Sequence, residues 1–234
     1  MNKQQEYDPI IKSYLKFQSP KENRGNVIVY FLIFLDALGL LPIVAVPFSH
    51  DFFIAALIPI AVIHLWALLY VIAPYKFEQS YYLFFGFYGL VNTYVFFLTT
   101  QKLLYRNIGA EGPWPFIMGA IFFIGLIIGA NGLNIKALYS GTYARLQNQK
   151  KGTKANLSPV VAASGLGYVI AQLILTYIYS ESVRMMIFVL LISILSILTA
   201  FFSIYIHRYF FILKNHDMVK QMYPQFGLPK KIRN

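Results

Sequence analysis

Long uncharged stretches alternate with short polar and charged ones along this chain. Six of the uncharged stretches are close to the roughly 20 residues that an α-helix needs to cross a 30 Å hydrocarbon core. They cover residues 27–48, 52–74, 80–100, 115–135, 159–180 and 185–206. The pattern predicts an all-α fold, a polytopic membrane protein built as a bundle of six transmembrane helices over residues 27–206.

The segments that flank the predicted bundle are polar. Residues 1–26 carry no apolar run of the kind a cleavable signal peptide needs, so they are expected to stay as a cytoplasmic segment. Asp8–Pro9 is a good helix start, and the residues that follow suit either a short interfacial helix or a disordered tail. Ser19–Pro20 is interpreted as its end. Residues 207–234 are expected to form a basic cytoplasmic tail, with the last helix continuing toward Met222.

Composition supports a membrane location. Of the 234 residues, 58% are hydrophobic and 12% charged, where a soluble domain has about 25% charged residues. The chain has no cysteine, which excludes disulfides, thiol catalysis and cysteine metal sites. A net charge of +11 would suggest nucleic acid in a soluble protein. Here the basic residues are interpreted as topology signals and contacts to anionic membrane lipids, with no nucleic-acid partner.

The lysines and arginines are distributed unequally between the two predicted sides of the membrane. Seventeen fall in the N-terminal segment, two alternate loops and the C-terminal tail, against three in the other loops. Cytoplasmic loops carry the excess of Lys and Arg. The distribution predicts that both termini lie on the cytoplasmic side of a bacterial cytoplasmic membrane.

Asp36 and His64 are polar residues near the middle of the first two predicted spans. A carboxylate at that depth is costly unless it is paired or protonated. Only residues 49–51 separate the spans, and the two residues lie almost equally far from this turn, so they are expected at nearly the same depth. Gly39 thins the same face of the first span and would allow close approach. The rotation of each helix decides whether the two side chains meet.

Asn92 in the third span and Gln172 in the fifth are predicted at mid-depth as well. Together with Asp36 and His64 they would form one mid-membrane polar cluster. One interpretation is a proton or ion pathway or a substrate-binding centre. The other is a hydrogen-bonded lock between helices, in which each contact contributes about 1 kcal/mol. One His and one Asp lack the ligand count of a metal site, so no metal is expected.

Small and hydroxyl-bearing residues form stripes on the last three spans. Gly125 and Gly129 make a GxxxG pattern, and a second small-residue stripe consists of Ala163, Gly167 and Ala171. Such stripes suit helix packing inside the bundle or against another membrane protein. The sixth span carries Ser193, Ser196, Thr199 and Ser203 along one side. These hydroxyls could line a pore or hydrogen-bond back to their own helix.

No catalytic motif is found. A P-loop, HExxH, GxSxG and a Rossmann glycine pattern are all missing. The chain is therefore predicted to be no enzyme, with no catalytic residue and no cofactor.

The general layout resembles that of small polytopic membrane proteins encoded near type VII secretion toxins in staphylococci and related Firmicutes. The resemblance rests on the polar segment Ser-Pro-Lys-Glu-Asn-Arg-Gly-Asn (residues 19–26), the usage rich in Lys, Asn, Ile, Tyr and Phe, the six spans and the ending Pro-Lys-Lys-Ile-Arg-Asn. It implies an immunity protein against a membrane-active toxin, sometimes within a two-protein membrane complex. It assigns no role to any residue.

The function expected from the sequence is therefore a non-enzymatic membrane protein that protects the cytoplasmic membrane from a secreted toxin, by binding the toxin or a membrane partner. The alternative is a small transporter, or the membrane subunit of one, that uses the polar cluster. A structural subunit of a larger membrane assembly is a third possibility.

Overall fold

Five helices of the computed structural model are long and apolar enough to cross a membrane. The structure describes residues 14–15, 17–150 and 180–233, and within these ranges it contains helices and no strand. The candidate spans are Pro20–Val44, His50–Ile72, Tyr81–Ile108, Trp114–Tyr139 and Glu181–Lys214. Residues 159–179 of the fifth expected span lie outside the described residues, so the number of six spans stays a prediction.

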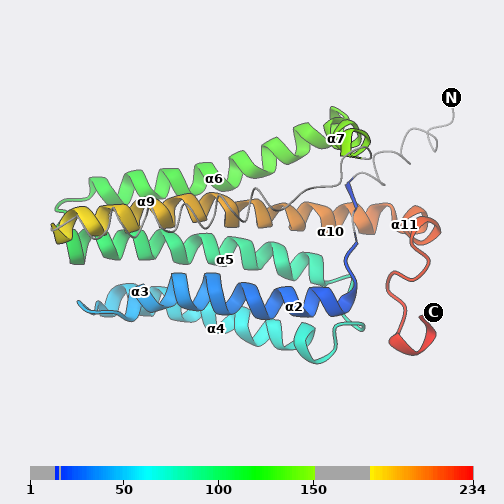
Figure 1. Cartoon of the computed structure of the whole chain (residues 1–234), viewed down its shortest axis with the longest axis horizontal. Helices are drawn as coiled ribbons and strands as arrows, with labels where there is room; N and C mark the ends of the chain where they lie inside the picture. The colour runs from blue at the N-terminus through cyan, green and yellow to red at the C-terminus, as the bar shows by residue number, and fades with distance from the viewer. Residues whose placement is uncertain (1–13, 16, 151–179, 234) are drawn as a thin grey trace.

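The long helices are built from shorter elements that succeed one another along the chain (Figure 1). The first comprises α2 (Pro20–Tyr30), the π-helical η1 (Phe31–Leu40) and α3 (Leu41–Val44). It is followed by α4 (His50–Ile72), by α5 (Tyr81–Lys102) with the π-helical η2 (Leu103–Ile108), and by α6 (Trp114–Tyr139) and α7 (Thr142–Lys150). After residue 180 come α9 (Glu181–Ala200), η3 (Phe201–Ser203), α10 (Ile204–Lys214), α11 (His216–Met222) and η4 (Lys230–Ile232).

The first long helix begins seven residues before the expected residue 27. Ser19 is its N-cap: the Ser19 hydroxyl accepts from the Glu22 amide, and the Glu22 carboxylate accepts from the Ser19 amide. This capping box, with Pro20 at the first helical position, satisfies amides that a helix start leaves unpaired. Ser19–Pro20, interpreted as the end of a preceding helix, thus also begins the first long helix, and most of the expected preceding helix lies outside the described residues.

The same helix ends at Val44, four residues before the expected position. Its π-helical part, Phe31–Leu40, leads directly into the turn that holds Pro42. Proline lacks an amide hydrogen and clashes with the carbonyl four residues earlier, and a π-helical turn is one way to accommodate it. Pro47 disfavours the helical conformation of the residue before it. The connector to α4 is accordingly residues 45–49, and not the expected residues 49–51.

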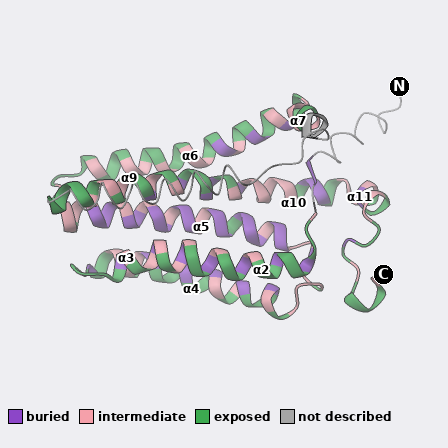
Figure 2. Ribbon diagram, in the orientation of Figure 1, coloured by how far each residue is buried: buried purple, intermediate pink, exposed green. Residues whose placement is uncertain are grey.

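Helix α5 is the central and most buried of the long helices. It contacts the first helix, α4, α6, α9 and α10, and buried residues follow it along most of its length (Figure 2). Its core is aromatic, including Tyr81, Tyr82, Phe84, Phe85 and Tyr88. Gly86 and Gly89 let η3 and α10 approach closely, because a Cβ at Gly89 would lie 2.6 Å from the Cβ of Phe202. The helix continues through Lys102 to Ile108, eight residues beyond the expected end of the third span at residue 100.

The segment after α10 packs back onto the end of the bundle that also carries α7. The Tyr223 hydroxyl donates to the Leu15 carbonyl, and Phe226 is buried. Glu78 is 3% exposed, pairs with Arg233 and accepts from the Gly227 amide. The basic tail expected over residues 207–234 is thus helical to Lys214 and again over His216–Met222, and its later part is anchored to the bundle through a buried ion pair.

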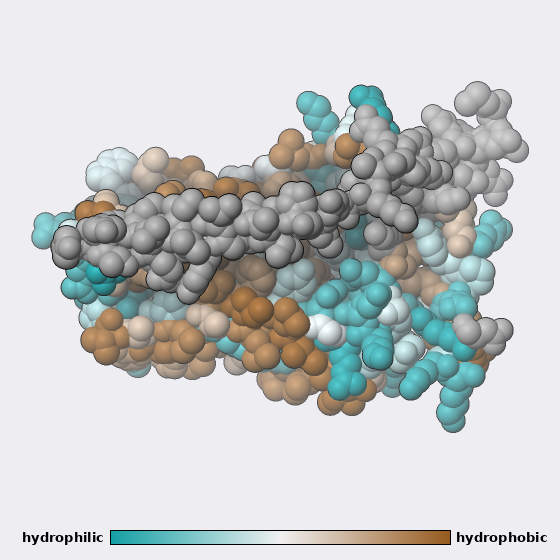
Figure 3. Space-filling model, viewed as in Figure 1, coloured by the Kyte–Doolittle hydropathy of each residue, from teal (hydrophilic) through white to brown (hydrophobic). Residues whose placement is uncertain are grey.

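Apolar side chains cover much of the outer surface. Figure 3 shows them over the first two long helices, while hydrophilic side chains gather toward the end that carries α11. Large exposed hydrophobic residues also follow α6 and α9, among them Ile121, Ile128, Leu133, Leu190 and Leu198. In water such a surface would be an aggregation liability, whereas hydrocarbon chains solvate it. The length of the described helices and this surface are thus both consistent with a membrane protein.

Candidate functional site

Asp36 and His64 lie side by side between the first two long helices. Asp36 belongs to η1 and His64 to α4, and the Asp36 Oδ1 to His64 Nε2 distance is 3.3 Å. Their matched depth in the antiparallel hairpin, which the sequence indicated, is thus accompanied by rotations that bring the two side chains together. The contact joins the two long helices that precede α5 in the described part of the chain.

The tautomer of His64 follows from its second contact. Its Nδ1 lies 2.9 Å from the carbonyl oxygen of Ile60, one turn earlier in α4. A carbonyl oxygen only accepts hydrogen bonds, so Nδ1 must carry a proton. In the neutral ring Nε2 is then an acceptor, and it faces an acidic side chain. One further proton between Nε2 and Asp36 completes the contact, as a protonated Asp36 or as an imidazolium beside a carboxylate.

Aromatic rings close one side of the pair. The Phe31 ring meets the His64 ring edge-on, with centroids 4.9 Å apart, and stacks on Tyr88 at 4.8 Å. The Tyr88 hydroxyl donates to the Tyr30 carbonyl, which fixes that ring against the first helix. The other side is open among the described residues: the side chains of Asp36 and His64 are 34% and 39% exposed. The pair therefore sits at the surface of the hairpin and not in its centre.

The other two members of the expected polar cluster are not seen to join this pair. Asn92 is fully buried in α5, and neither its amide nitrogen nor its amide oxygen has a hydrogen-bond partner among the described residues. Gln172 lies outside the described residues. The structure thus brings together Asp36 and His64 and gives Asn92 no hydrogen bond to either of them. The sequence predicts mid-depth for Asn92, but the direction of its side chain depends on the rotation of α5.

Of the two small-residue stripes, the structure describes only the one on α6. A Cβ at Gly125 or Gly129 would meet nothing within 4 Å in the described part of the chain, so this face of α6 is open there. Ala163, Gly167 and Ala171 lie outside the described residues. Close packing instead uses Gly86 and Gly89, which the sequence analysis did not single out because they are hidden in an aromatic run.

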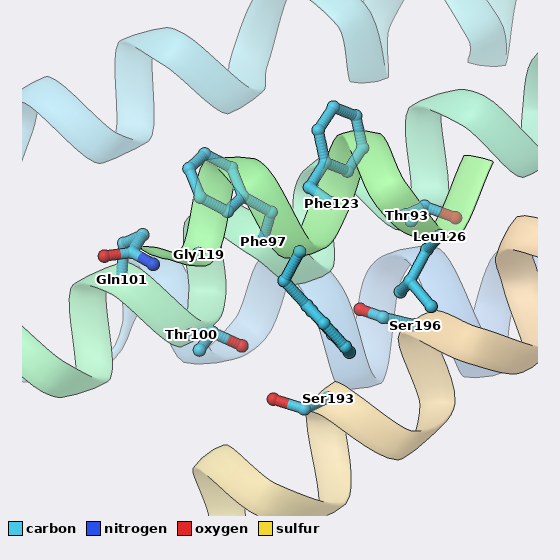
Figure 4. A pocket seen from close by; sticks show the side chains of 10 residues that line it. Thr93, Phe97, Thr100, Gln101, Gly119, Phe123, Leu126, Ser193 and Ser196 are labelled. Atoms are coloured by element: carbon cyan, nitrogen blue, oxygen red, sulfur yellow. The ribbon is translucent and has the colours of Figure 1, made fainter. Parts of the chain in front are cut away.

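The hydroxyl stripe of the last span faces α5 and α6. Three of its hydroxyls, those of Ser193, Thr199 and Ser203, donate to carbonyl groups of their own helix. This agrees with the alternative in which the hydroxyls bond back to their helix and do not line a pore. Two of them also bond across helices: Thr199 with Thr93 at 2.9 Å, and Ser203 with Asn131 at 2.7 Å. Ser193 and Ser196 line a cavity of about 30 Å³ with Thr93, Thr100 and Gln101 (Figure 4). This volume suits one or two waters.

A polar network that the sequence pattern does not predict lies at the end of the bundle that carries α7. The Asn134 amide donates to the Tyr14 hydroxyl at 3.1 Å, and the Tyr143 hydroxyl donates to Asn134 Oδ1 at 2.9 Å. The Tyr14 hydroxyl also lies 2.8 Å from His207 Nδ1. Burial raises the pKa of Tyr14 and of Tyr143, so both phenols stay protonated donors. The network ties residue 14 to α6, α7 and α10.

No protein-family model, curated protein or solved structure matches this chain. The ranges that the structure describes also hold no group of three His, Asp or Glu side chains that could bind a metal ion. The function is therefore inferred from the geometry of the described residues, in which the Asp36–His64 pair is the strongest candidate site.

Proposed function

We propose that this chain is a non-enzymatic, multi-pass protein of the bacterial cytoplasmic membrane that binds another membrane-embedded protein. The observation that carries the proposal is the partial exposure of Asp36 and His64 on the outside of the hairpin. Acyl chains cannot hydrogen-bond, so a polar pair that faces them is unfavourable, and intramembrane polar residues usually meet a partner. A polar side chain on a neighbouring transmembrane helix would supply that partner.

The surroundings of the pair suit a helix-to-helix contact. Leu32 and Leu68 stand one helical turn from Asp36 and His64, respectively, and both are exposed. On such a surface the leucines would contribute the contact area with a partner helix. A hydrogen bond from the partner to the polar pair would set the orientation of that helix. The biological form that we propose is toxin immunity: the chain binds a toxin, or a toxin-binding membrane subunit, and so prevents pore assembly by direct occlusion.

The six-span topology is part of the same proposal. Residues 159–180 supply the additional span, and the basic segments then lie on the cytoplasmic side with both termini. Reporter fusions after residues 146 and 234 are expected to give a cytoplasmic signal, and a fusion at Ala110 an external one. A cytoplasmic signal at Ala110 would contradict this topology.

Photo-crosslinking tests the partner directly. A benzophenone amino acid at Leu32 or Leu68, in cells that make both the chain and its neighbours, is expected to give an adduct larger than the chain. The captured protein should, when expressed alone, permeabilise the membrane, and co-expression of this chain should restore growth. Ile128 on α6 is the matched control, because it is as exposed as these leucines but belongs to a different helix.

Two results would contradict the proposal. One is a crosslink from Leu32 and Leu68 only to residues 159–180 of the same chain, which would mean that the chain covers its own polar pair. The other is an identical set of adducts from Ile128, which would indicate random collision in the bilayer.

The second candidate function is proton-coupled transport, and one observation favours it. While Nδ1 bonds to the Ile60 carbonyl, Nε2 faces Asp36 Oδ1 at 3.3 Å, and a proton could pass between two such groups. A transporter needs a proton to leave this pair, whereas a lock or docking contact needs only that the two side chains stay together. Substitutions at Asp36 that keep a contact to His64 Nε2 but remove the exchangeable proton therefore distinguish proton-coupled transport from partner binding.

A further inference from the structure

A cavity of about 220 Å³ lies at the end of the bundle opposite α7 and α11, between α3, η2 and α9. Its walls are mostly apolar and include Pro42, Val46, Leu103, Met185, Phe188 and Ile192. It is independent of the Asp36–His64 pair, none of whose residues line it. Two polar side chains, Lys102 and Asn107, interrupt the apolar wall.

Lys102 is a buried cation in this wall. It is the last residue of α5, and only 1% of it is exposed. Its Nζ donates to the carbonyl of Ala45, 3.0 Å away, just past the end of the first helix. This bond caps one carbonyl at a helix C-terminus. An ammonium has three N–H donors, so the cap accounts for one of them.

No carboxylate neutralises this cation among the described residues. The ion pairs there involve His64, Arg106 and Arg233, and none involves Lys102. A buried charge is costly unless it is paired and hydrogen-bonded. The missing negative charge is the first indication that this end of the bundle receives an anion.

Asn107 supplies a second, independent indication. Its Oδ1 is buried and has no hydrogen-bond partner in the described part of the chain. The acceptor requires a donor, such as a hydroxyl group, which an acyl chain alone does not offer. Water alone is a poor occupant, because most of the wall offers it no polar partner. An amphipathic molecule satisfies the cation, the amide oxygen and the apolar wall together.

We propose that this cavity binds one amphipathic anion, an acyl chain with a phosphate or carboxylate head group. The head group lies at Lys102 and accepts from its free N–H donors, and the acyl chain lies along Met185, Phe188 and Ile192. A phospholipid with a hydroxyl-bearing head group would also donate to Asn107 Oδ1. A free fatty acid would satisfy Lys102 alone.

Native mass spectrometry of the purified, delipidated chain tests this site. The probes are dioleoylphosphatidylglycerol, oleate and the zwitterionic dioleoylphosphatidylcholine. One molecule of an anionic probe should bind with at least about tenfold higher affinity than the zwitterion, since a charge-assisted hydrogen bond contributes about that factor. Tighter binding of the glycerol lipid identifies a phospholipid site, and equal or tighter binding of oleate identifies a fatty-acid site.

Lys102→Met should abolish the preference for anionic probes, because it keeps the side-chain length and removes the charge. Lys230→Met is the matched control: Lys230 is exposed near the opposite end, and its loss should leave the preference intact. Ala45→Trp covers the case in which Lys102→Met fails to fold. It keeps the carbonyl bond and Lys102, but fills the cavity from an exposed position and should displace the probe.

Three results would overturn the proposal. They are equal affinity for anionic and zwitterionic probes, an unchanged preference in a folded Lys102→Met variant, and unchanged binding in Ala45→Trp. The first of these would mean that Lys102 serves only as a hydrated helix cap.

Discussion

Asp36→Leu is expected to destabilise the protein by about 1–3 kcal/mol, because it leaves His64 Nε2 without a partner in an apolar environment. Asp36→Asn should cost much less. The Nδ1 bond to the Ile60 carbonyl makes Nε2 an acceptor, and the amide of asparagine can donate to it. Combining Asp36→Leu with His64→Leu should recover part of the loss, since no unpaired polar group then remains.

Folded yield and thermal unfolding in detergent measure the stability, while partner capture and proton flux into vesicles measure the function. A docking contact predicts that Asp36→Asn keeps both stability and capture. A proton-transfer site predicts normal stability with lost flux, because the asparagine amide has no exchangeable acidic proton. If all of these variants match the original protein in every measurement, neither role belongs to the pair.

The second large effect is expected from Gly89→Leu, which should lower the free energy of unfolding by about 3 kcal/mol or prevent folding. A Cβ at this position would lie 2.6 Å from the Phe202 Cβ and 2.8 Å from the Ser203 backbone nitrogen, so η3 has to move away from α5. The backbone of η3 cannot move aside as easily as the end of a flexible side chain. The amount of folded, monodisperse protein in detergent is the measurement.

Gly129→Leu is the matched control, because a Cβ there would meet no atom within 4 Å among the described residues. Its folded yield should stay near that of the original protein. Partner capture should also stay unchanged, because the partner is proposed to bind beside Asp36 and His64 on the first two long helices. A folding defect in Gly129→Leu as severe as in Gly89→Leu would show that this face is packed inside the bundle.

The depth of Asp36 and His64 was predictable although the ends of their helices were not. Asp36 stands eight residues before Val44 and His64 fourteen residues after His50, a mismatch of about 9 Å along straight helices. The connector of residues 45–49 begins and ends in extended conformation and supplies length that a helical turn would not. Symmetric counting from the turn therefore gave the right depth for the pair despite wrong helix boundaries.

The role of Lys102 could not be predicted from the sequence. By charge counting it is an outward loop residue, because a lysine after an apolar run normally marks a membrane surface. The structure continues the helix past it and turns its ammonium to the end of the neighbouring helix. Charge patterns predict which side of a membrane a segment occupies. They do not indicate the rotation of a helix about its own axis, which decides where the side chain of Lys102 lies.

The π-helical winding of residues 31–40 has a consequence for the pair that it carries. Each of its hydrogen bonds reaches one residue further than in an α-helix, so the segment holds an extra residue that could be released. Rewinding by one residue would turn Asp36 by about 100° around the helix axis and away from His64. The Asp36–His64 contact therefore favours the π-helical winding of residues 31–40 over an α-helical one, in which the two side chains would be turned apart.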